Sequence, residues 1–486
     1  MKCIDAISTA FKRSTSNESV LWSGKFIHDI PCFPIKPLLP VVIGACTGPL
    51  GGLCRIQLHD DEPSQQDIID SSLVAGISNW DNPPDEADGI SLSLYDRKDG
   101  TVGRHGDPIA DVYAVVVRQN NTILAVADGC SWGHKPRLAA RCAVRGSMEY
   151  LTQKLFNGES MVCDTQQIIR NMLRSFDSAQ KMIVENNGTT TTLCVAVVCE
   201  LAEPKGENGW GLCVVSVGDS PCFVWQSKAR QVIEVTSAAH EGQNRDMRDS
   251  GGCLGANVGD DPDLDNLTCS FALLAKGDIV FVTSDGISDN FDPVTLLEPT
   301  TPAHSASPHV SLPVLSPDQR QAALLANLTR VIQGIRSQFE NEPICAWEVK
   351  EAIVKHVIDV TNNQRGCMET SLKNVDNPEL STLERRAKEL EFKEKLKTMG
   401  GKLDHATLAV YEVTECVLSR HNQTRMDTDG TIHFKSIYLS DGQKEVLLAL
   451  SKVSKLLIAI SSNHCCWTSG KHGEIWAMFS FLSRKV

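Results

Sequence analysis

Short runs of apolar, β-branched residues alternate with helical patterns through the middle of the chain. VYAVVV from Val112 and TILAVAD from Thr122 are separated by the turn-forming sequence RQNN, so they predict a pair of strands. Apolar residues at helical spacing then predict two helices, over about 135–155 and 165–184. Further strand-like runs begin at Thr189, Trp210, Pro221, Gly277 and Leu403. This order predicts an α+β fold with antiparallel sheets rather than regular βαβ alternation.

Changes in composition along the sequence divide the chain into three regions. Residues 1–95 contain Pro, Gly and acidic polar runs, and we expect them to be a largely irregular N-terminal region. The strands and helices above belong to a domain that we place at 96–415. Residues 416–486 read as a C-terminal tail with one apolar helical segment, which we expect to dock on a partner surface.

A long insertion, which we place at about 292–403, interrupts the domain before its last strand. Its stretch 299–315 is rich in Pro and Ser, so we expect it to be poorly ordered. Ser316 with Pro317 predicts the start of a helix, and a further helix is expected over about 346–360. After a polar linker, Ser381 and Glu384 form a capping-box pattern before a helix that is charged nearly all round.

Charge and composition exclude some classes of function. The 486 residues carry 47 Lys and Arg against 60 Asp and Glu, a net charge of −13. This balance argues against nucleic acid as the main partner and is compatible with binding cations. No apolar stretch is long enough to span a membrane. The 18 cysteines, without a secretory signal pattern, read as reduced thiols of an intracellular protein, cytoplasmic or nuclear.

Aspartates recur at the ends of the predicted strands. Asp128, Asp219 and Asp285 each follow a strand, while Asp111 and Asp404 each precede one. If these strand ends meet at one sheet edge, the crowded carboxylates need a compensating cation, and all-oxygen ligands suit Mg²⁺ or Mn²⁺. Asp-Gly is also a common turn former, and that reading is favoured for any single position. Five such positions in one domain favour a metal site.

The motifs around these aspartates occur in a recognisable order. VADG at Val126, GTTTTL at Gly188, VGDS at Val217, SDGISDN at Ser284 and DHATLAV at Asp404 resemble the signature blocks of the metal-dependent protein serine/threonine phosphatases, the PPM or type 2C family. The resemblance covers about residues 100–415. It implies a β-sandwich of two antiparallel sheets flanked by helices, and hydrolysis of phosphoserine and phosphothreonine in a phosphoprotein substrate.

The resemblance also implies roles for individual residues. Asp128 would bridge two Mg²⁺ or Mn²⁺ ions, and Gly129 would offer its carbonyl to one of them. Asp285 and Asp404 would hold one ion of the pair. A water between two such cations loses its proton near neutral pH and attacks phosphorus, so no protein nucleophile is needed.

Three further aspartates and one arginine complete the implied site. Asp111 would reach the metals mainly through water. Asp219 and Asp289 would match ligands of a third, weaker metal. Arg104 is the nearest candidate for the phosphate-binding arginine, because a guanidinium donates two hydrogen bonds to a phosphate at once; an ordinary loop arginine is the alternative.

Four positions depart from the family pattern. Ala110 stands where an acidic residue is usual, Cys130 where many members have a histidine, Pro221 where an arginine follows the GDS block, and His405 where an asparagine is usual. We therefore hold two main hypotheses for what we expect to be a monomer: an active Mg²⁺- or Mn²⁺-dependent phosphatase, and a pseudophosphatase acting as a protein-interaction module. A regulatory scaffold that binds partners through its tail and insertion is a third.

Overall fold

The chain divides into two units, and all the described residues belong to the first, which ends at residue 419. The computed structural model describes residues 21–25, 27–49, 51–54, 56, 73–101, 103–158, 161–237, 247, 249–297, 315–336, 343–375 and 381–414. The predicted tail at 416–486 and almost all of the stretch at 299–315 lie outside these residues. The domain boundaries stay predictions.

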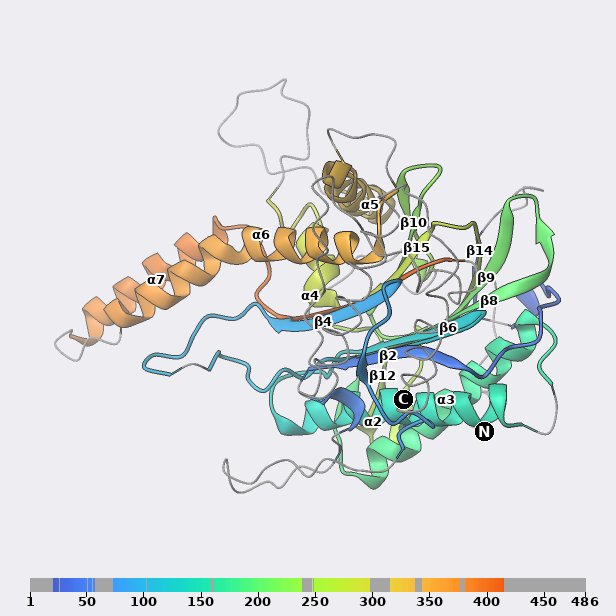
Figure 1. Cartoon of the computed structure of the whole chain (residues 1–486). Helices are drawn as coiled ribbons and strands as arrows, with labels where there is room; N and C mark the ends of the chain where they lie inside the picture. The colour runs from blue at the N-terminus through green and yellow to red at the C-terminus, as the bar shows by residue number, and fades with distance from the viewer. Residues whose placement is uncertain are drawn as a thin grey trace, which may run out of the picture. The chain divides into compact units, whose positions relative to one another are not determined.

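Two larger antiparallel sheets form the centre of the described fold (Figure 1). The first contains, in spatial order, β1 (Leu21–Gly24), β14 (Thr268–Leu274), β9 (Asn208–Val217), β8 (Leu193–Lys205), β6 (Asn121–Ala127), β5 (Val112–Arg118), β2 (Val42–Gly48) and β3 (Asp81–Asn82). The second contains β11 (Gln231–Glu234), β10 (Cys222–Gln226), β15 (Ile279–Thr283), β16 (His405–Glu412) and β4 (Ala87–Ser93). A small third sheet joins β13 (Asp261–Asp263), β12 (Cys253–Val258) and β7 (Thr190–Thr191).

The alternation of side chains along the strands explains how the two sheets stack. In β5, Val115 and Val117 point into a core shared with Val224 of β10 and Val280 of β15. Their neighbours Val112, Ala114 and Val116 point to the opposite face. There they pack against α2 (His134–Phe156) and α3 (Thr165–Glu185). Both faces of the first sheet are therefore buried.

The second sheet is covered on its outer face in the same way. Phe223 of β10 and Phe281 of β15 stack with ring centroids 5.3 Å apart. They share a buried cluster with apolar residues of α5 (Pro317–Gln333) and α6 (Ala346–Val375). The result is a helix–sheet–sheet–helix sandwich, which confirms the predicted α+β class with two antiparallel sheets flanked by helices (Figure 1).

The N-terminal region, expected to be largely irregular, supplies strands to both sheets. β1 and β3 are edge strands of the first sheet, and β4 closes the second by pairing with β16. β1 and β3 are short, and β2 and β4 contain glycines, so these segments lack the β-branched runs that mark the central strands. They form strands because long buried neighbours offer them pairing partners. Short 3₁₀ turns lie at Ile27–Asp29 and Gly52–Cys54.

The described part of the insertion is helical. The predicted capping box at Ser381 is present before α7 (Thr382–Lys397), and Ser316, predicted to start a helix, forms a second capping box before α5. A 3₁₀ turn, Gly334–Arg336, follows α5. α6 continues to Val375, through part of the stretch expected to be a linker. Buried Cys367 shows that this extension still packs on the fold.

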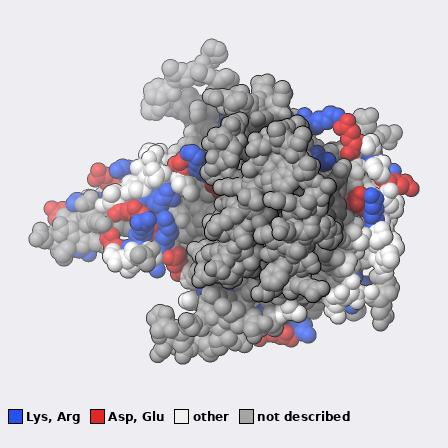
Figure 2. Space-filling view, in the orientation of Figure 1, with Lys and Arg blue, Asp and Glu red and all other residues white. Residues whose placement is uncertain are grey.

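The last helix of the insertion, α7, buries none of its residues, as its charge pattern predicts. Figure 2 shows basic and acidic side chains intermingled where α6 and α7 project. Within the described residues, no helix combines the length and the apolar character needed to cross a bilayer.

Candidate metal centre

Strand register brings the aspartates of the sequence motifs to one end of the sandwich. Val112 of β5 pairs with Ala127 of β6, so the adjoining Asp111 and Asp128 lie at the same sheet end. In the second sheet, Thr283 of β15 pairs with Leu408 of β16, which places the following helical turn beside the start of β16. Asp285 and Asp404 therefore become neighbours although 119 residues separate them in sequence.

The Asp128 turn is fixed by the threonines of the GTTTTL motif. The Asp128 backbone N–H donates to Thr192 Oγ1 over 3.0 Å. Its carbonyl accepts from the Thr192 N–H at 2.9 Å and from Thr191 Oγ1 at 2.8 Å. A Cβ at Gly129 would lie 2.5 Å from the Pro136 carbonyl oxygen, so only glycine fits after Asp128.

The second half of the site is built by α4 (Asp285–Ser288), the following 3₁₀ turn Asp289–Phe291 and the approach to β16. Gly286 packs so closely on the His405 carbonyl that any side chain at this position would overlap it. The Asp404 carboxylate accepts through Oδ1 from the His405 N–H at 2.9 Å and from the Tyr95 hydroxyl at 3.1 Å. Asp285 and Asp404 are thereby held against each other.

These two halves enclose a hollow of about 260 Å³, which we call the acidic hollow. Four of the predicted aspartates, Asp128, Asp219, Asp285 and Asp404, line it. The other lining residues are Tyr95, Gly129, Cys130, Ser131, Trp132, Thr192, Met247, Ser250, Lys402 and His405. Such a concentration of carboxylates around one hollow is a site for positive charge.

The pKa values of Asp128 and Asp111 record this crowding. Burial raises the pKa of Asp128 well above its ordinary value, and the charges of Asp111, Asp285, Asp404 and Asp219 raise it further. Burial also raises the pKa of Asp111 to about 6, although His405 and Ser284 oppose the rise. Both Asp111 carboxylate oxygens are buried without a conventional hydrogen-bond partner. Among the described residues, no lysine or arginine forms an ion pair with Asp111 or Asp128 on this side of the hollow.

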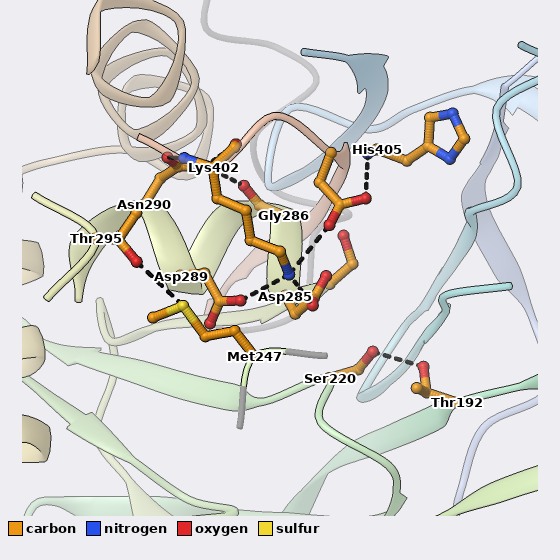
Figure 3. Close-up of polar contacts among 12 residues, drawn as sticks. Thr192, Ser220, Met247, Asp285, Gly286, Asp289, Asn290, Thr295, Lys402 and His405 are labelled. Carbon is orange, nitrogen blue, oxygen red and sulfur yellow. Dashed lines mark hydrogen bonds and ion pairs between the residues drawn. The ribbon is translucent and has the colours of Figure 1, made fainter. Parts of the chain in front are cut away.

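A lysine neutralises the side of the hollow that carries Asp285 and Asp404. The Lys402 ammonium donates to Asp285 Oδ2 and to Asp289 Oδ2 at 2.8 Å, and it forms an ion pair with Asp404 Oδ2 at 3.0 Å. Figure 3 shows the lysine side chain reaching between Asp285 and Asp289. Burial alone would lower the pKa of Lys402, but the three carboxylates raise it above its ordinary value. Lys402 therefore stays charged.

The comparison with known families covers the strands, helices and motifs that build this site. Residues 102–329 match the family model described as Protein phosphatase 2C. This segment belongs to the protein phosphatase 2C family. The matched part of this PP2C-like domain includes Asp111, Asp128, Asp219, Asp285 and Asp289, while Lys402 and Asp404 lie beyond it.

A fruit-fly relative supports the same assignment. The PP2C-like domain-containing protein CG9801 of Drosophila melanogaster is 42% identical over 269 residues. The match covers 54% of this chain and 37% of the fly protein, so the chain spans little more than a third of that relative.

Solved structures of the same kind are also similar. A serine/threonine phosphatase of S. agalactiae matches 67% of this chain and 100% of its own, with 13% identity and a TM-score of 0.36. RsbX in complex with magnesium matches 67% of this chain and 94% of its own, with 11% identity and a TM-score of 0.29. Because these identities and TM-scores are low, the assignment to the family rests on the family model, the fly relative and the motifs.

Most of the predicted site residues of the PP2C-like domain gather at the acidic hollow. Gly129 and the four lining aspartates face the hollow. Asp289 is fully buried and forms an ion pair with the Lys402 ammonium. Asp111 is fully buried and close enough to raise the pKa of Asp128. Their roles as metal ligands stay predictions.

Arg104 lies elsewhere. Its guanidinium donates to the Tyr95 carbonyl at 2.6 Å, and it lines a separate hollow of about 410 Å³ with Arg97 and Arg365. It is not among the residues that line the acidic hollow. Its role in binding a substrate phosphate stays a prediction.

The positions that depart from the family pattern lie close to the site. The Ala110 N–H donates to His405 Nδ1 at 3.3 Å, so these two replacements contact each other. Cys130 lines the acidic hollow, and burial raises the pKa of its thiol to about 12. Cys130 is therefore a neutral thiol at neutral pH, which argues against a role as a nucleophile.

The donor set fits a divalent cation on one side of the hollow. Within the described residues, no three His, Cys, Asp or Glu side chains are placed together as ligands of one ion. On the Asp285 side, Lys402 stands among the carboxylates instead. On the other side, the orphaned Asp111 carboxylate and Asp128 are oxygen donors of the type that Mg²⁺ and Mn²⁺ prefer.

Sequence reasoning missed Lys402, Tyr95 and Asn290. One signal was present for Lys402. Residues two apart in an extended segment point to the same side, so a lysine two positions before Asp404 is placed to reach the same hollow. Tyr95 and Asn290 carry no such signal, because their contacts depend on how distant loops pack.

Proposed function

We propose that the PP2C-like domain is a metal-dependent protein phosphatase that hydrolyses phosphoserine and phosphothreonine through an activated water. The observation that supports this most is the crowding of carboxylates at the acidic hollow, where Asp111 is fully buried and Asp128 lines the hollow with Asp219, Asp285 and Asp404. Like charges this crowded are costly to bury without a cation, so their presence favours a bound metal ion.

Asp128, the Gly129 carbonyl and Asp111 would hold Mg²⁺ or Mn²⁺. A bound divalent ion lowers the pKa of water toward neutrality and polarises the phosphate oxygens. The family resemblance implies a second such ion at Asp285 and Asp404, and a weaker third at Asp219 and Asp289. The proposal depends only on the first of these ions; the second and third stay expectations from the resemblance, and Lys402 contacts three of the carboxylates that they would need.

The rim of the hollow suits a phosphorylated side chain. Trp132 is 55% exposed, and its indole N–H donates to the Tyr95 hydroxyl at 2.9 Å. The two rings meet edge to face, with centroids 5.0 Å apart. This aromatic pair offers an exposed apolar surface beside the carboxylates, against which a peptide can lie while its phosphate enters. At about 260 Å³, the hollow holds a side chain rather than a folded partner.

A pseudophosphatase is the second candidate, and Lys402 favours it. In that case the domain keeps the fold and the acidic hollow, but the ammonium satisfies the carboxylates that an ion would otherwise bind. Ala110 and Cys130 also remove side chains that the family pattern supplies.

One assay separates the two candidates. Full-length protein is incubated with a phosphothreonine peptide and Mn²⁺, or with a chelator, and released phosphate is measured. The proposal predicts Mn²⁺-dependent turnover that Asp128→Asn abolishes. Asp88→Asn is the matched control and should retain turnover, because Asp88 of β4 pairs with Lys350 of α6 and does not line the hollow. Wild-type protein without turnover under these conditions would establish the pseudophosphatase.

A further inference from the structure

Three carboxylates surround the Lys402 ammonium. It donates hydrogen bonds to Asp285 and Asp289 and forms an ion pair with Asp404 at 3.0 Å. The Asp289 side chain is fully buried and that of Lys402 is 21% exposed. The contact is thus an enclosed ion cluster rather than a surface salt bridge.

The backbone around Lys402 holds the lysine in this position. The Asn290 side chain accepts from the Lys402 N–H at 2.8 Å and donates to the Lys402 carbonyl at 3.0 Å. It also donates to the Gly286 carbonyl at 2.8 Å, which ties this segment to the turn that carries Asp285 (Figure 3). The preceding Gly401 has a φ of +100°, and its N–H donates to the Thr295 carbonyl at 3.0 Å.

The two sides of the acidic hollow are therefore unequal. Asp285, Asp289 and Asp404 share a cation supplied by the chain itself. Asp111 and Asp128 lie near the same carboxylates, and no lysine or arginine in the described part of the chain forms an ion pair with them. A divalent ion placed among the first three would meet an ammonium at contact distance, and the repulsion between the two charges would exclude one of them.

We propose that Lys402 is a tethered cation that takes the place of one divalent ion, so that the hollow binds a single divalent ion beside Asp128 and Asp111. A second ion enters among Asp285, Asp289 and Asp404 only when the lysine leaves. This rests on the proposed function only in that the hollow binds a divalent ion, and not on turnover.

The number of Mn²⁺ ions bound per chain tests the proposal. Full-length wild type, Lys402→Met and Lys350→Met are titrated with Mn²⁺, and free ion is counted by electron paramagnetic resonance. Methionine keeps the length of the side chain and removes the charge. We expect one ion per chain in the wild type and two in Lys402→Met. Lys350 is the matched control, because it is also a half-buried, ion-paired lysine; Lys350→Met should bind one.

Two ions in the wild type, or the same number in wild type and Lys402→Met, would overturn the proposal. So would the absence of binding in every protein, which would also remove the metal-dependent function. A single bound ion without phosphatase turnover would contradict only the proposed function. Turnover with two ions in the wild type would contradict only the role of Lys402.

A second comparison does not depend on Lys402→Met folding. If the lysine occupies the Asp289 side, Asp289→Asn should leave the wild-type Mn²⁺ affinity within about threefold, well below the tenfold change that 1.4 kcal/mol represents. Asp128→Asn should abolish binding. A tenfold or larger loss of affinity in Asp289→Asn would place the ion among the carboxylates that we assign to Lys402, and would overturn the proposal.

Discussion

Replacing Lys402 by methionine should destabilise the metal-free protein severely. The substitution removes the ammonium that contacts Asp285, Asp289 and Asp404 and leaves their carboxylates facing one another. These side chains are 12%, 0% and 24% exposed, so water can replace the lost contacts only in part.

The magnitude follows from what each contact contributes. The two hydrogen bonds that Lys402 donates to charged groups, at about 1.5–3 kcal/mol each, would sum to about 3–6 kcal/mol, to which the ion pair with Asp404 adds. That sum is an upper bound, because the exposed edge of Asp404 can rehydrate and the carboxylates can take up protons. Breaking a buried ion pair by removing one partner costs about 3–5 kcal/mol. We therefore expect the free energy of unfolding to fall by about 3–5 kcal/mol near pH 7.

Urea denaturation followed by tryptophan fluorescence, with a chelator present, measures this loss. Lys350→Met serves as the control, because it removes contacts to Asp88 at 2.6 Å and Glu351 at 3.3 Å, and Glu351 is 62% exposed. It should cost about 1 kcal/mol. Adding Mn²⁺ should restore most of the stability of Lys402→Met, because an ion then replaces the missing charge. A loss below about 1 kcal/mol, or no effect of Mn²⁺, would refute the reasoning.

Three further outcomes are expected. Phe281→Ala removes a fully buried ring stacked on Phe223 and should lower the free energy of unfolding by about 3–5 kcal/mol; a loss below about 1 kcal/mol in urea denaturation would contradict the described core. Because burial raises the pKa of Cys130 to about 12, iodoacetamide near pH 8 should leave it unmodified in peptide mass spectra while exposed Cys163 reacts; equal labelling would be inconsistent with this burial. The pKa of Asp111 is about 6 in the folded protein, so its ionisation penalises folding above pH 6 and the penalty fades as pH falls toward 4. Metal-free Asp111→Asn should thus be more stable than wild type by up to about 3 kcal/mol near pH 7, and by less near pH 5; a gain that grows as pH falls would show the opposite sign.

The centre of the fold could be predicted from the sequence because the local residue pattern of each central strand is enough to identify it. The runs at Val112 and Thr122 are rich in β-branched residues, and they pair in register as neighbouring strands. The edge strand β4, with the sequence ADGISLS, has no such run and becomes a strand by pairing with β16. Its pairing partner lies more than 300 residues away, and no local pattern encodes that distance.

The site divides in the same way. The positions of Asp128 and Asp285 follow from strand ends, which a periodic pattern locates well. Which cation neutralises these carboxylates does not follow from the strand ends, because it depends on which side chain enters the hollow from another loop. Lys402 reaches it only because Asn290 fixes the backbone of its loop on both sides. Arg104 was placed near the site by sequence distance, yet its guanidinium contacts the Tyr95 carbonyl and lines another hollow.

The most direct test of the account is a crystal structure of the full-length protein grown with Mn²⁺, with the ions located by anomalous scattering. The account predicts one peak, bound by Asp128 and the Gly129 carbonyl with Asp111 nearby, and the Lys402 ammonium still among Asp285, Asp289 and Asp404. Two peaks bridged by Asp128, with Lys402 turned out of the hollow, would contradict it.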